Sequence, residues 1–409
     1  MKRLLLSSLA LAASLAAQSQ EARWGYIDKT GSFAIEPQYG QARSFSCDVA
    51  WVKYASTRWS LIDKKGATPS TMPVRGFDVV LDFTDENGIT RVQSGDSWMY
   101  INTLGRMVKS DDSYGSGMDS YYEGLACFLK GDKWGFVDLS GAEVIKPQFD
   151  RSAQFSEGLA LVYLKGKIGY VDKSGKMAVK PQGWEGANDF RDGLALAWKD
   201  GKYGYIDQKG KYAIPPAPWQ DAESFSDGLA AVQKGGRWGY IDKSGAQAIE
   251  CRFAEAGDFR SGFAVYKEGK KSGLIDKTGR VVVEARFDNI GHGDASDGIL
   301  ALVKLDGKFG LVDASGKLIV EPLYEEIWGM FGGVAKVKLG GLYGFIDSTG
   351  KTVIEPRFEN VTNCSEGLIG FKKDGKWGYM DKEGAVVIEP RFEEAMAFSQ
   401  GLAAVKARP

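Results

Sequence analysis

The sequence has 409 residues, of which 52 are basic, 53 are acidic and one is histidine, so its formal net charge is −1 at pH 7. This near balance excludes the strong positive charge with which proteins bind nucleic acid or anionic membrane surfaces.

Residues 1–19 read MKRLLLSSLALAASLAAQS and have the three-part layout of a secretory signal peptide: a basic start at Lys2 and Arg3, an apolar run, and small residues. The sequence therefore predicts an exported protein, periplasmic or extracellular, whose mature domain spans residues 20–409. Loss of Lys2 and Arg3 leaves 50 basic against 53 acidic residues, a net charge near −3. No later run approaches the roughly 20 apolar residues that cross a bilayer, so the mature chain is expected to have no membrane span.

One short pattern recurs along the rest of the chain. The segment RWGYIDKTG begins at Arg23, and close variants such as KWGFVDLSG, KYGYIDQKG, RWGYIDKSG and KWGYMDKEG follow. Aligned on the aromatic-glycine pair, the pattern occurs eleven times at steps of 34 to 39 residues, which indicates a repeat architecture. The copies begin at Trp24, Trp59, Trp98, Trp134, Ile168, Tyr203, Trp238, Ser272, Phe309, Tyr343 and Trp377. A segment used this often is predicted to be scaffold rather than active site.

Two turn signals lie in each unit. Asp374 and Gly375 separate two apolar segments, and an Asp-Gly pair between strand-like runs predicts a type I′ hairpin turn. The second signal is D-x-x-G, as in residues 172–175, which fits a type I turn or a bulged hairpin loop. Asn102 takes the aspartate position in one copy.

These turns divide each unit into three short antiparallel strands, reading GLAxV, WGYID and VVIEP. The third strand is predicted to end at proline, for example Pro390, because proline cannot donate to a continuing ladder. An aromatic-x-x-small-x-x-Phe segment, as in residues 392–398, then predicts one turn of helix or an irregular loop leading to the next unit. In the middle strand Trp377 and Tyr379 point one way and Gly378 the other, so both faces are apolar and neighbouring units are expected to cover both.

On these motifs the chain resembles the bacterial WG-repeat (KWG-repeat) proteins over residues 22–405. The repeat pattern predicts an all-β fold, a tandem array of eleven three-stranded antiparallel units. The array starts on a middle strand, residues 22–28, and finishes on a first strand, residues 401–407. Pairing the two would remove two exposed edges, so a propeller-like closed ring is favoured over an open β superhelix, which stays the alternative.

The second and third repeats, about residues 59–125, depart from the pattern and contain the acidic and aromatic stretch DDSYGSGMDSYYEG. As a functional segment it would be a docking loop or a weak cation or sugar site. An ordinary solvated loop is the favoured interpretation, because no EF-hand spacing is present. The candidate binding residues are Asp111, Asp112, Tyr114, Asp119, Tyr121 and Tyr122.

The histidine and the cysteines give no sign of catalysis. His292, beside Asp294, has no second histidine, nearby cysteine or G-x-S-x-G serine with which to build a zinc site or a triad, so it is expected in a surface loop. The four cysteines occupy different repeat positions in non-adjacent repeats, so buried free thiols are expected rather than disulfides. They are Cys47, Cys127, Cys251 and Cys364.

The leading functional hypothesis is an exported, non-enzymatic repeat scaffold that binds a protein or a cell-envelope polymer, with no cofactor and no metal. Two alternatives stay open. One is a carbohydrate-binding module that uses exposed aromatic side chains. The other is a glycan hydrolase with loop carboxylates, which requires a pair about 5 to 9.5 Å apart in a groove.

Overall fold

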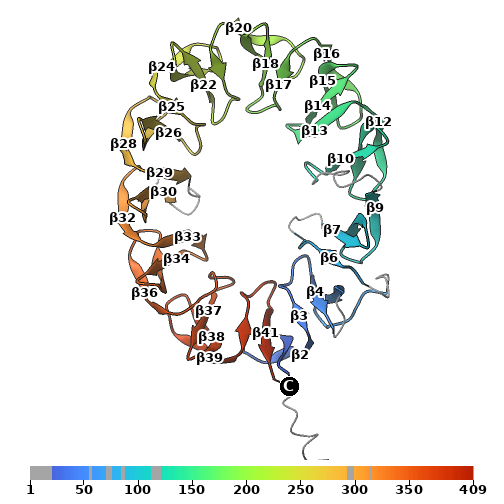
Figure 1. Cartoon of the computed structure of the whole chain (residues 1–409), viewed down its shortest axis with the longest axis vertical. Helices are drawn as coiled ribbons and strands as arrows, with labels where there is room; N and C mark the ends of the chain where they lie inside the picture. Colours follow the sequence, from blue (N-terminus) through green and yellow to red (C-terminus); the bar gives the residue numbers. More distant parts are fainter. Residues whose placement is uncertain are drawn as a thin grey trace, which may run out of the picture. The chain divides into compact units, whose positions relative to one another are not determined.

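The computed structural model describes residues 21–54, 58–70, 76–83, 88–111, 121–292, 299–313 and 315–408, with backbone alone at 109–111, 292, 299 and 300. It divides into two compact units. Unit 1 contains Met1–Thr84, Thr103–Gly105 and Phe358–Pro409, and unit 2 contains Asp85–Asn102 and Arg106–Arg357. The described residues form strands and turns and no helix, grouped in eleven small antiparallel sheets (Figure 1). The predicted all-β array of eleven propeller-type repeats is confirmed.

Unit 1 holds the sheets of strand order β2-β1-β41-β40, β3-β4-β5 and β37-β38-β39. Its strands are β1 (Arg23–Ile27), β2 (Phe33–Tyr39), β3 (Gln41–Ala42), β4 (Val49–Lys53), β5 (Ser60–Asp63), β6 (Val79–Val80), β37 (Leu368–Lys373), β38 (Lys376–Asp381), β39 (Val386–Phe392), β40 (Glu394–Ala395) and β41 (Ala403–Ala407).

In unit 2 the sheets follow the chain in sequence order, from the β7-β8-β9 strands and the sheet β10-β11-β12 to β33-β34-β35-β36. The strands up to β22 are β7 (Ile89–Ser94), β8 (Ser97–Asn102), β9 (Met107–Asp111), β10 (Leu125–Lys130), β11 (Lys133–Asp138), β12 (Glu143–Phe149), β13 (Arg151–Ser156), β14 (Leu159–Leu164), β15 (Lys167–Asp172), β16 (Met177–Gln182), β17 (Gly186–Ala187), β18 (Ala195–Lys199), β19 (Lys202–Ile206), β20 (Tyr212–Ala217), β21 (Asp221–Ala222) and β22 (Leu229–Lys234). The strands from β23 on are β23 (Arg237–Asp242), β24 (Gln247–Phe253), β25 (Glu255–Ala256), β26 (Phe263–Glu268), β27 (Lys271–Asp276), β28 (Val281–Phe287), β29 (Asn289–His292), β30 (Ile299–Leu305), β31 (Lys308–Asp313), β32 (Leu318–Tyr324), β33 (Glu326–Phe331), β34 (Val334–Leu339), β35 (Leu342–Asp347) and β36 (Thr352–Phe358).

Most sheets have one strand more than predicted. The aromatic-x-x-small-x-x-Phe segment is neither a helical turn nor a loop, because its small residue lies in a short strand, such as β21, that pairs with the first strand of the same sheet. Around β21, Gln220 N–H donates to the Gln233 carbonyl and Glu223 N–H to the Ala231 carbonyl, both at 2.9 Å. These backbone bonds join the connecting segment to the sheet, which gives the four-stranded blade common in propellers.

The prediction that the third strand ends at proline is wrong. The strand continues for two more residues and ends at an aromatic residue. In β39 the partners Trp377↔Phe392 and Tyr379↔Ile388 enclose a bulge that contains Pro390, so its missing N–H interrupts no ladder bond. The bulge presses on the glycine of the WG pair. A Cβ on Gly378 would lie 2.5 Å from the Ile388 carbonyl oxygen and 2.7 Å from the Pro390 nitrogen. The glycine therefore leaves room for the facing backbone of the third strand.

The D-x-x-G segment forms the predicted turn. In residues 172–175 the Gly175 N–H donates to the Asp172 carbonyl at 2.9 Å, and Gly175 has a φ of +86°. Asp172 Oδ1 accepts hydrogen bonds from the N–H groups of Ser174 and Lys176 and from the Ser174 hydroxyl. The Asp-Gly pairs are type I′ turns, since φ is +51° at Asp374 and +77° at Gly375.

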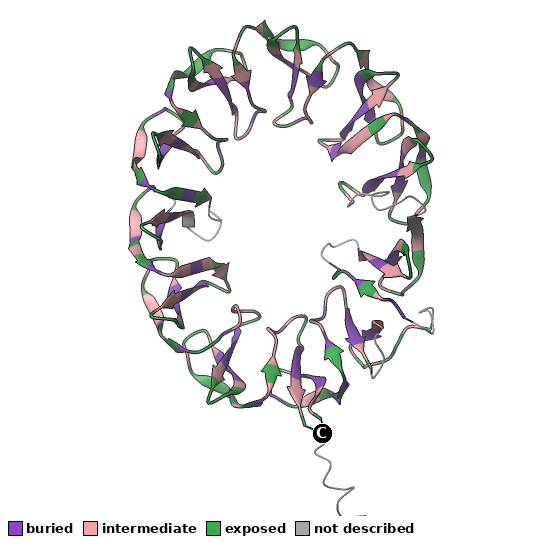
Figure 2. Ribbon diagram, viewed as in Figure 1, coloured by how far each residue is buried: buried purple, intermediate pink, exposed green. Residues whose placement is uncertain are grey.

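Apolar clusters lie between neighbouring sheets within each unit, and the middle strands are buried on both faces as predicted (Figure 2). In β23, Trp238 and Tyr240 point into one cluster, but their burial differs. Tyr240 is inaccessible to solvent, whereas the Trp238 indole is only half-buried at the edge of the cluster. The predicted burial of the face that carries the tryptophan is therefore confirmed for Tyr240, and for Trp24 in β1, but not for the Trp238 indole.

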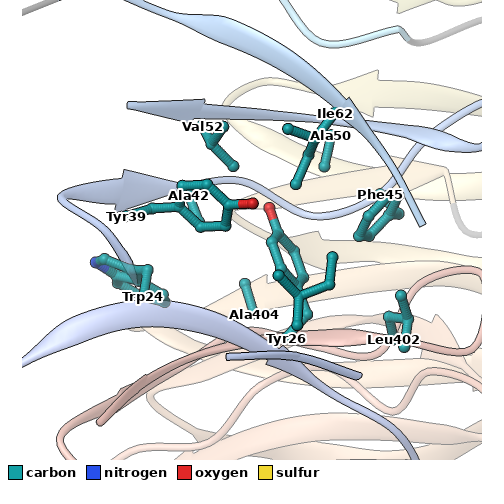
Figure 3. Close-up of a cluster of buried hydrophobic side chains, with 11 residues drawn as sticks. Trp24, Tyr26, Tyr39, Ala42, Phe45, Ala50, Val52, Ile62, Leu402 and Ala404 are labelled. Carbon is teal, nitrogen blue, oxygen red and sulfur yellow. The ribbon is translucent and has the colours of Figure 1, made fainter. Parts of the chain in front are cut away.

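The first and last strands of the chain pair, as the closed arrangement requires. β1 and β41 are antiparallel in register from Arg23↔Ala407 to Ile27↔Ala403. Leu402 and Ala404 pack with Tyr26 in a cluster that also includes Val52 of β4 (Figure 3). The predicted pairing of the two ends is confirmed within unit 1.

Candidate functional site

The phenylalanine that ends the connecting segment is followed by Ser, an acid and Gly, as in residues 155–158 (FSEG) and 225–228 (FSDG), and we call this four-residue turn FSEG. FSEG turns form a ladder of hydrogen bonds between neighbouring sheets. In unit 2, Ser226 Oγ donates to the Phe259 carbonyl at 2.8 Å, and Asp227 Oδ2 accepts the Gly262 N–H at 2.6 Å. Lys277 Nζ pairs with the other Asp227 oxygen at 2.7 Å. Asp227 itself has a φ of +56° because it is the first central residue of a two-residue hairpin turn.

The same bonds recur elsewhere. Acidic side chains accept the next turn's glycine N–H in the pairs Glu123 and Gly158, Glu157 and Gly193, Asp192 and Gly228, and Glu366 and Gly401. Unit 1 continues the ladder through the chain ends, where Ser399 Oγ donates to the Phe45 carbonyl and the neutral Gln400 accepts the Asp48 N–H at 2.8 Å. The recurrent serine, acid and glycine are therefore structural, and a functional site is sought among residues that the repeat does not use.

Two cavities lined by described residues stand out, one in each compact unit. The cavity of unit 1, about 620 Å³, lies between the turn of residues 30–33 and strands β38 and β39. Its charged groups are already engaged: Glu393 pairs with Lys376 and with Arg408, and Arg391 donates to the Gly31 carbonyl. In this cavity Glu393, Lys376 and Arg408 are thus paired in charge, and the Arg391 guanidinium is hydrogen-bonded to a backbone carbonyl.

The cavity of unit 2, about 460 Å³, is smaller but differs in kind. It lies along the β13, β17, β21 and β25 segments of four successive sheets, and we name it the Asp189 groove. Its lining is Arg151, Ser152, Ala153, Leu161, Tyr163, Ala187, Asn188, Asp189, Arg191, Glu223, Ser224 and Asp258. Its volume falls within the range of pockets that bind small molecules and short peptide segments.

Five charged side chains line the Asp189 groove, and within the described part of the chain none of them forms a side-chain hydrogen bond or an ion pair. They are Arg151, Asp189, Arg191, Glu223 and Asp258. Burial raises the pKa of the Asp189 carboxyl above its usual range, against the opposing effect of Arg191. Burial also raises the pKa of Glu223, and the nearby Asp258 and Asp221 carboxylates add to the shift. Both carboxylates are thus partly desolvated, and neither forms an ion pair with a described residue.

The backbone under the groove is fixed by buried tyrosines of the preceding sheets. The hydroxyls of Tyr170, Tyr205 and Tyr240 donate to the carbonyls of Asn188, Glu223 and Gly257 at 2.6 to 2.7 Å. Asn188 Nδ2 also donates to Ser224 Oγ at 3.0 Å, which links two sheets along the groove. The acidic side chains therefore project from a preformed frame.

These acids lie at the two positions between the small residue and the phenylalanine of the connecting segment, in three consecutive repeats. The corresponding residues are Asn188 and Asp189, Glu223 and Ser224, and Gly257 and Asp258. At the same position of the second repeat, Asp82 pairs with Arg43 at 2.9 Å within unit 1. The repeat fold does not require a carboxylate here, since Met396 and Ala397 take the two positions in the last repeat.

The residues predicted as a docking loop are only partly described. Asp112, Tyr114 and Asp119 lie outside the described residues, and Asp111 ends β9 with its backbone alone described. Tyr121 occupies the phenylalanine position of FSEG, is half-buried, and donates its hydroxyl to the Asp138 carbonyl at 3.1 Å. Tyr122 is exposed beside the turn. Neither tyrosine lines a cavity described above, and the docking-loop hypothesis stays a prediction. Sequence reasoning missed the Asp189 groove.

His292 is not in a loop as expected but is the last residue of β29, with its backbone alone described. All four cysteines are free; Cys127 and Cys364 are buried, and Cys47 and Cys251 are half-buried. Among the described residues, no group of three or more histidine, cysteine, aspartate or glutamate side chains is arranged to hold a metal ion.

The profile of a family described as WG containing repeat matches nine segments of the sequence: residues 24–55, 134–167, 168–203, 203–238, 238–271, 273–309, 309–343, 343–377 and 377–407. The chain belongs to this WG-repeat family. The unmatched stretch between residues 55 and 134 contains the two degenerate repeats. No curated protein matches the sequence of this WG-repeat chain significantly.

The fold of this WG-repeat protein is similar to several solved structures at low sequence identity. The computationally designed Ika8 protein is 12% identical with a TM-score of 0.37, over 66% of this chain and 93% of that one. A eukaryotic initiation factor is 12% identical with a TM-score of 0.40, over 82% and 95%. BamB from Moraxella catarrhalis is 10% identical with a TM-score of 0.32, over 72% and 95%. Similarity at this level carries no argument about activity or partners.

Proposed function

We propose that this WG-repeat protein is an exported, non-enzymatic scaffold that binds a protein or a cell-envelope polymer. The observation that carries the proposal is the Asp189 groove, where charged side chains of both signs converge without partners in the described part of the chain. Elsewhere the recurrent acids are engaged in the ladder between sheets, as Asp227 is. A preformed groove on a rigid repeat array is suited to binding, because little ordering is required when a ligand enters.

The test is capture of partners by the purified mature chain. Envelope extract of the source organism is passed over immobilised protein, and retained proteins and polysaccharides are identified. The triple variant D189N/E223Q/D258N removes the three carboxylates of the groove. Its matched control, E250Q/E284Q/E321Q, removes three exposed carboxylates that do not line the groove. We expect a partner retained by the wild type and by the second variant. Capture of nothing by any of the three proteins would contradict the scaffold proposal.

A glycan hydrolase is the second candidate, because the groove contains three carboxyls and Glu223 has a raised pKa, as a general acid requires. Against it, the lining includes only one aromatic side chain, Tyr163, and two arginines that a neutral sugar ring does not need. Release of reducing ends from envelope polysaccharide by the wild type, lost in E223Q with binding retained, would establish the hydrolase.

The carbohydrate-binding alternative has one structural basis in unit 2. Trp184 donates its indole N–H to the Tyr212 hydroxyl at 3.0 Å; the indole is half-buried against the cluster that contains Tyr170, and Tyr212 is exposed. Quenching of Trp fluorescence by polysaccharide in the wild type but not in W184A would favour that function.

Export belongs to the same proposal and rests on residues 1–19. The test is expression of the full chain in a bacterial host, followed by fractionation and mass spectrometry of the N-terminus. Cleavage after Ala16 or Ser19 is expected, and an intact N-terminus in the cytoplasmic fraction would contradict export.

A further inference from the structure

The charges in the Asp189 groove are ordered along the row of sheets in unit 2. Arg151 lies in β13 on the first of the four sheets, Asp189 and Arg191 follow β17 on the second, and Glu223 and Asp258 come from the third and fourth. One end of the groove is therefore basic and the other is acidic.

The acidic end lacks the neutralisation that equivalent acids receive elsewhere. Asp82 has the Arg43 guanidinium at 2.9 Å in unit 1, while Glu223 and Asp258 repel one another without an intervening cation. A ligand ammonium or guanidinium placed between them gains charge-assisted hydrogen bonds, and it relieves a repulsion that the folded protein already bears.

The groove also selects against other ligand classes. A nucleic-acid strand or a polyanionic polymer would bring like charge to Asp189, Glu223 and Asp258. A neutral polysaccharide would leave Arg151 and Arg191 without a charged partner, and Tyr163 is the one aromatic ring in the lining. A peptide segment with one basic and one acidic side chain satisfies both ends, and its backbone can hydrogen-bond with Asn188, Ser152 and Ser224.

We propose that the Asp189 groove binds an extended peptide segment of a partner protein, with a Lys or Arg side chain held between Glu223 and Asp258 and a carboxylate held by Arg151. This inference rests on the scaffold function proposed above and names its site and ligand class. Because the lining backbone is fixed by Tyr170, Tyr205 and Tyr240, the groove receives the segment without rearrangement.

The test uses the mature chain and three synthetic peptides with blocked ends. The first is Ala-Arg-Ala-Asp-Ala, the second has Asn for Asp, and the third has Gln for Arg. Calorimetric titration is performed at low salt and at 0.15 M NaCl. We expect the first peptide to bind about three- to fivefold more tightly than the second, which lacks one half-exposed ion pair, and about tenfold more tightly than the third, which lacks two. Salt should weaken its binding.

The variant D189N/E223Q/D258N should lose about tenfold or more in affinity for the first peptide, and E250Q/E284Q/E321Q should bind as the wild type does. R151Q should weaken the first peptide and leave the second unchanged. None of the three groove carboxylates has a hydrogen-bond partner among the described residues, so the triple variant is expected to keep its unfolding midpoint.

Two results would overturn the inference: no detectable binding of the first peptide by the wild type, or equal binding by the triple variant. These two results can be distinguished from a failure of the scaffold function by the capture experiment. If the capture experiment retains a protein that the triple variant retains equally well, the scaffold stands and its site is elsewhere. If the wild type captures a polysaccharide and the triple variant does not, the ligand of the groove is a polymer and not a peptide.

Discussion

Tyr240 is fully buried, its ring centroid lies 4.7 Å from that of Phe259 on the next sheet, and its hydroxyl donates to the Gly257 carbonyl at 2.7 Å. Trp238, two residues earlier, is only half-buried. The sequence showed correctly that both side chains share a face. It did not show that the tyrosine is more deeply buried, because alternation along a strand gives the direction of a side chain and not its distance from the edge of the core.

Tyr240→Ala should therefore destabilise the protein by about 3 to 5 kcal/mol, the cost of a large-to-small change in a packed core. Trp238→Ala should cost less, about 1 to 3 kcal/mol, since part of the indole is already in water. The measurement is urea unfolding of both variants. Equal losses, or a larger loss for Trp238→Ala, would show that the indole is the main core residue.

In the turn of residues 172–175, Asp172→Asn should change stability little. The amide oxygen can accept the same N–H donors, as Asn102 Oδ1 does from Arg106 N–H in its own turn. Gly175→Val should destabilise, because a β-branched residue resists the φ of +86° and its Cβ would lie 3.4 Å from Ile145. Thermal unfolding of the two variants tests this, and a normal melting temperature for Gly175→Val would contradict it.

Stability should decline in acid through the same turns. In five of them a hydrogen bond from the hydroxyl two residues later is the main cause that holds the pKa of the aspartate below its usual value: Asp28, Asp138, Asp172, Asp242 and Asp347. A pKa lower in the folded state contributes stability above the unfolded value, near pH 4, and that stability is lost as the pH falls through the folded value.

The measurement is urea unfolding at pH 7, 4 and 3. Replacing these five aspartates by asparagine should flatten the profile. The matched control replaces five exposed glutamates of the third strands by glutamine and should keep the slope: Glu36, Glu250, Glu284, Glu321 and Glu389. If the five asparagines leave the pH dependence of the unfolding free energy unchanged, other groups cause the acid sensitivity.

At the scale of elements, the sequence predicted the three strands and the two turns of each repeat, but it missed the short fourth strand and the turn inside FSEG. The strands and turns have local signals, namely alternation, Asp-Gly and D-x-x-G. The fourth strand, such as β21, has two residues and is defined by backbone bonds to a neighbour rather than by its own composition. The ladder of Ser226 and Asp227 joins different repeats, which no local pattern reveals.

The Asp189 groove was missed for a related reason. Asp189, Glu223 and Asp258 are 34 to 35 residues apart, so only the repeat period brings them together. Comparing each repeat position along the array would have exposed them, since Met396 and Ala397 show that the position tolerates neutral residues. The attention given to residues 111–122 followed a local concentration of acids and tyrosines instead.

Asp227 connects neighbouring elements through Gly262 and Lys277, so its replacement tests the ladder. Asp227→Asn keeps an acceptor and tolerates a φ of +56°, and it should cost under about 1 kcal/mol, as for a partly exposed ion pair. Asp227→Ala loses the acceptor and should cost about 1 to 3 kcal/mol. The control is Asp200→Ala, at the same kind of φ in a turn without a bond to another sheet. Equal effects at Asp227 and Asp200 would mean that the ladder contributes nothing.

At the scale of the chain, the decisive sequence signal was the order of strands at the two ends of the array, which begins on a middle strand and finishes on a first strand. The structure confirms that these strands pair in one sheet, β2-β1-β41-β40. The first WG segment thereby gains the neighbour that every other middle strand obtains from its own repeat. In the described part of unit 1, both ends of the array are covered rather than left as open sheet edges.

Deletion of residues 401–409 removes β41 from between β1 and β40. Hydrogen exchange should rise in residues 24–28 and in β40 together, because both lose their partner strand. Deletion of residues 408 and 409 alone is the control and should leave exchange in residues 24–28 unchanged. If the longer deletion raised exchange only near the C-terminus, the pairing of the two ends would be contradicted.

The pairing of β1 with β41 also sets the order of events during synthesis. β1 is synthesised long before its partner β41, so at about 5 to 20 residues per second the two are separated by some tens of seconds. The sheets of unit 2 contain strands close together in the sequence, but the sheet of β1 and β41 forms only after β41 has been synthesised. A prematurely terminated chain would keep β1 as a bare edge, which makes incomplete copies distinguishable from complete ones by proteases.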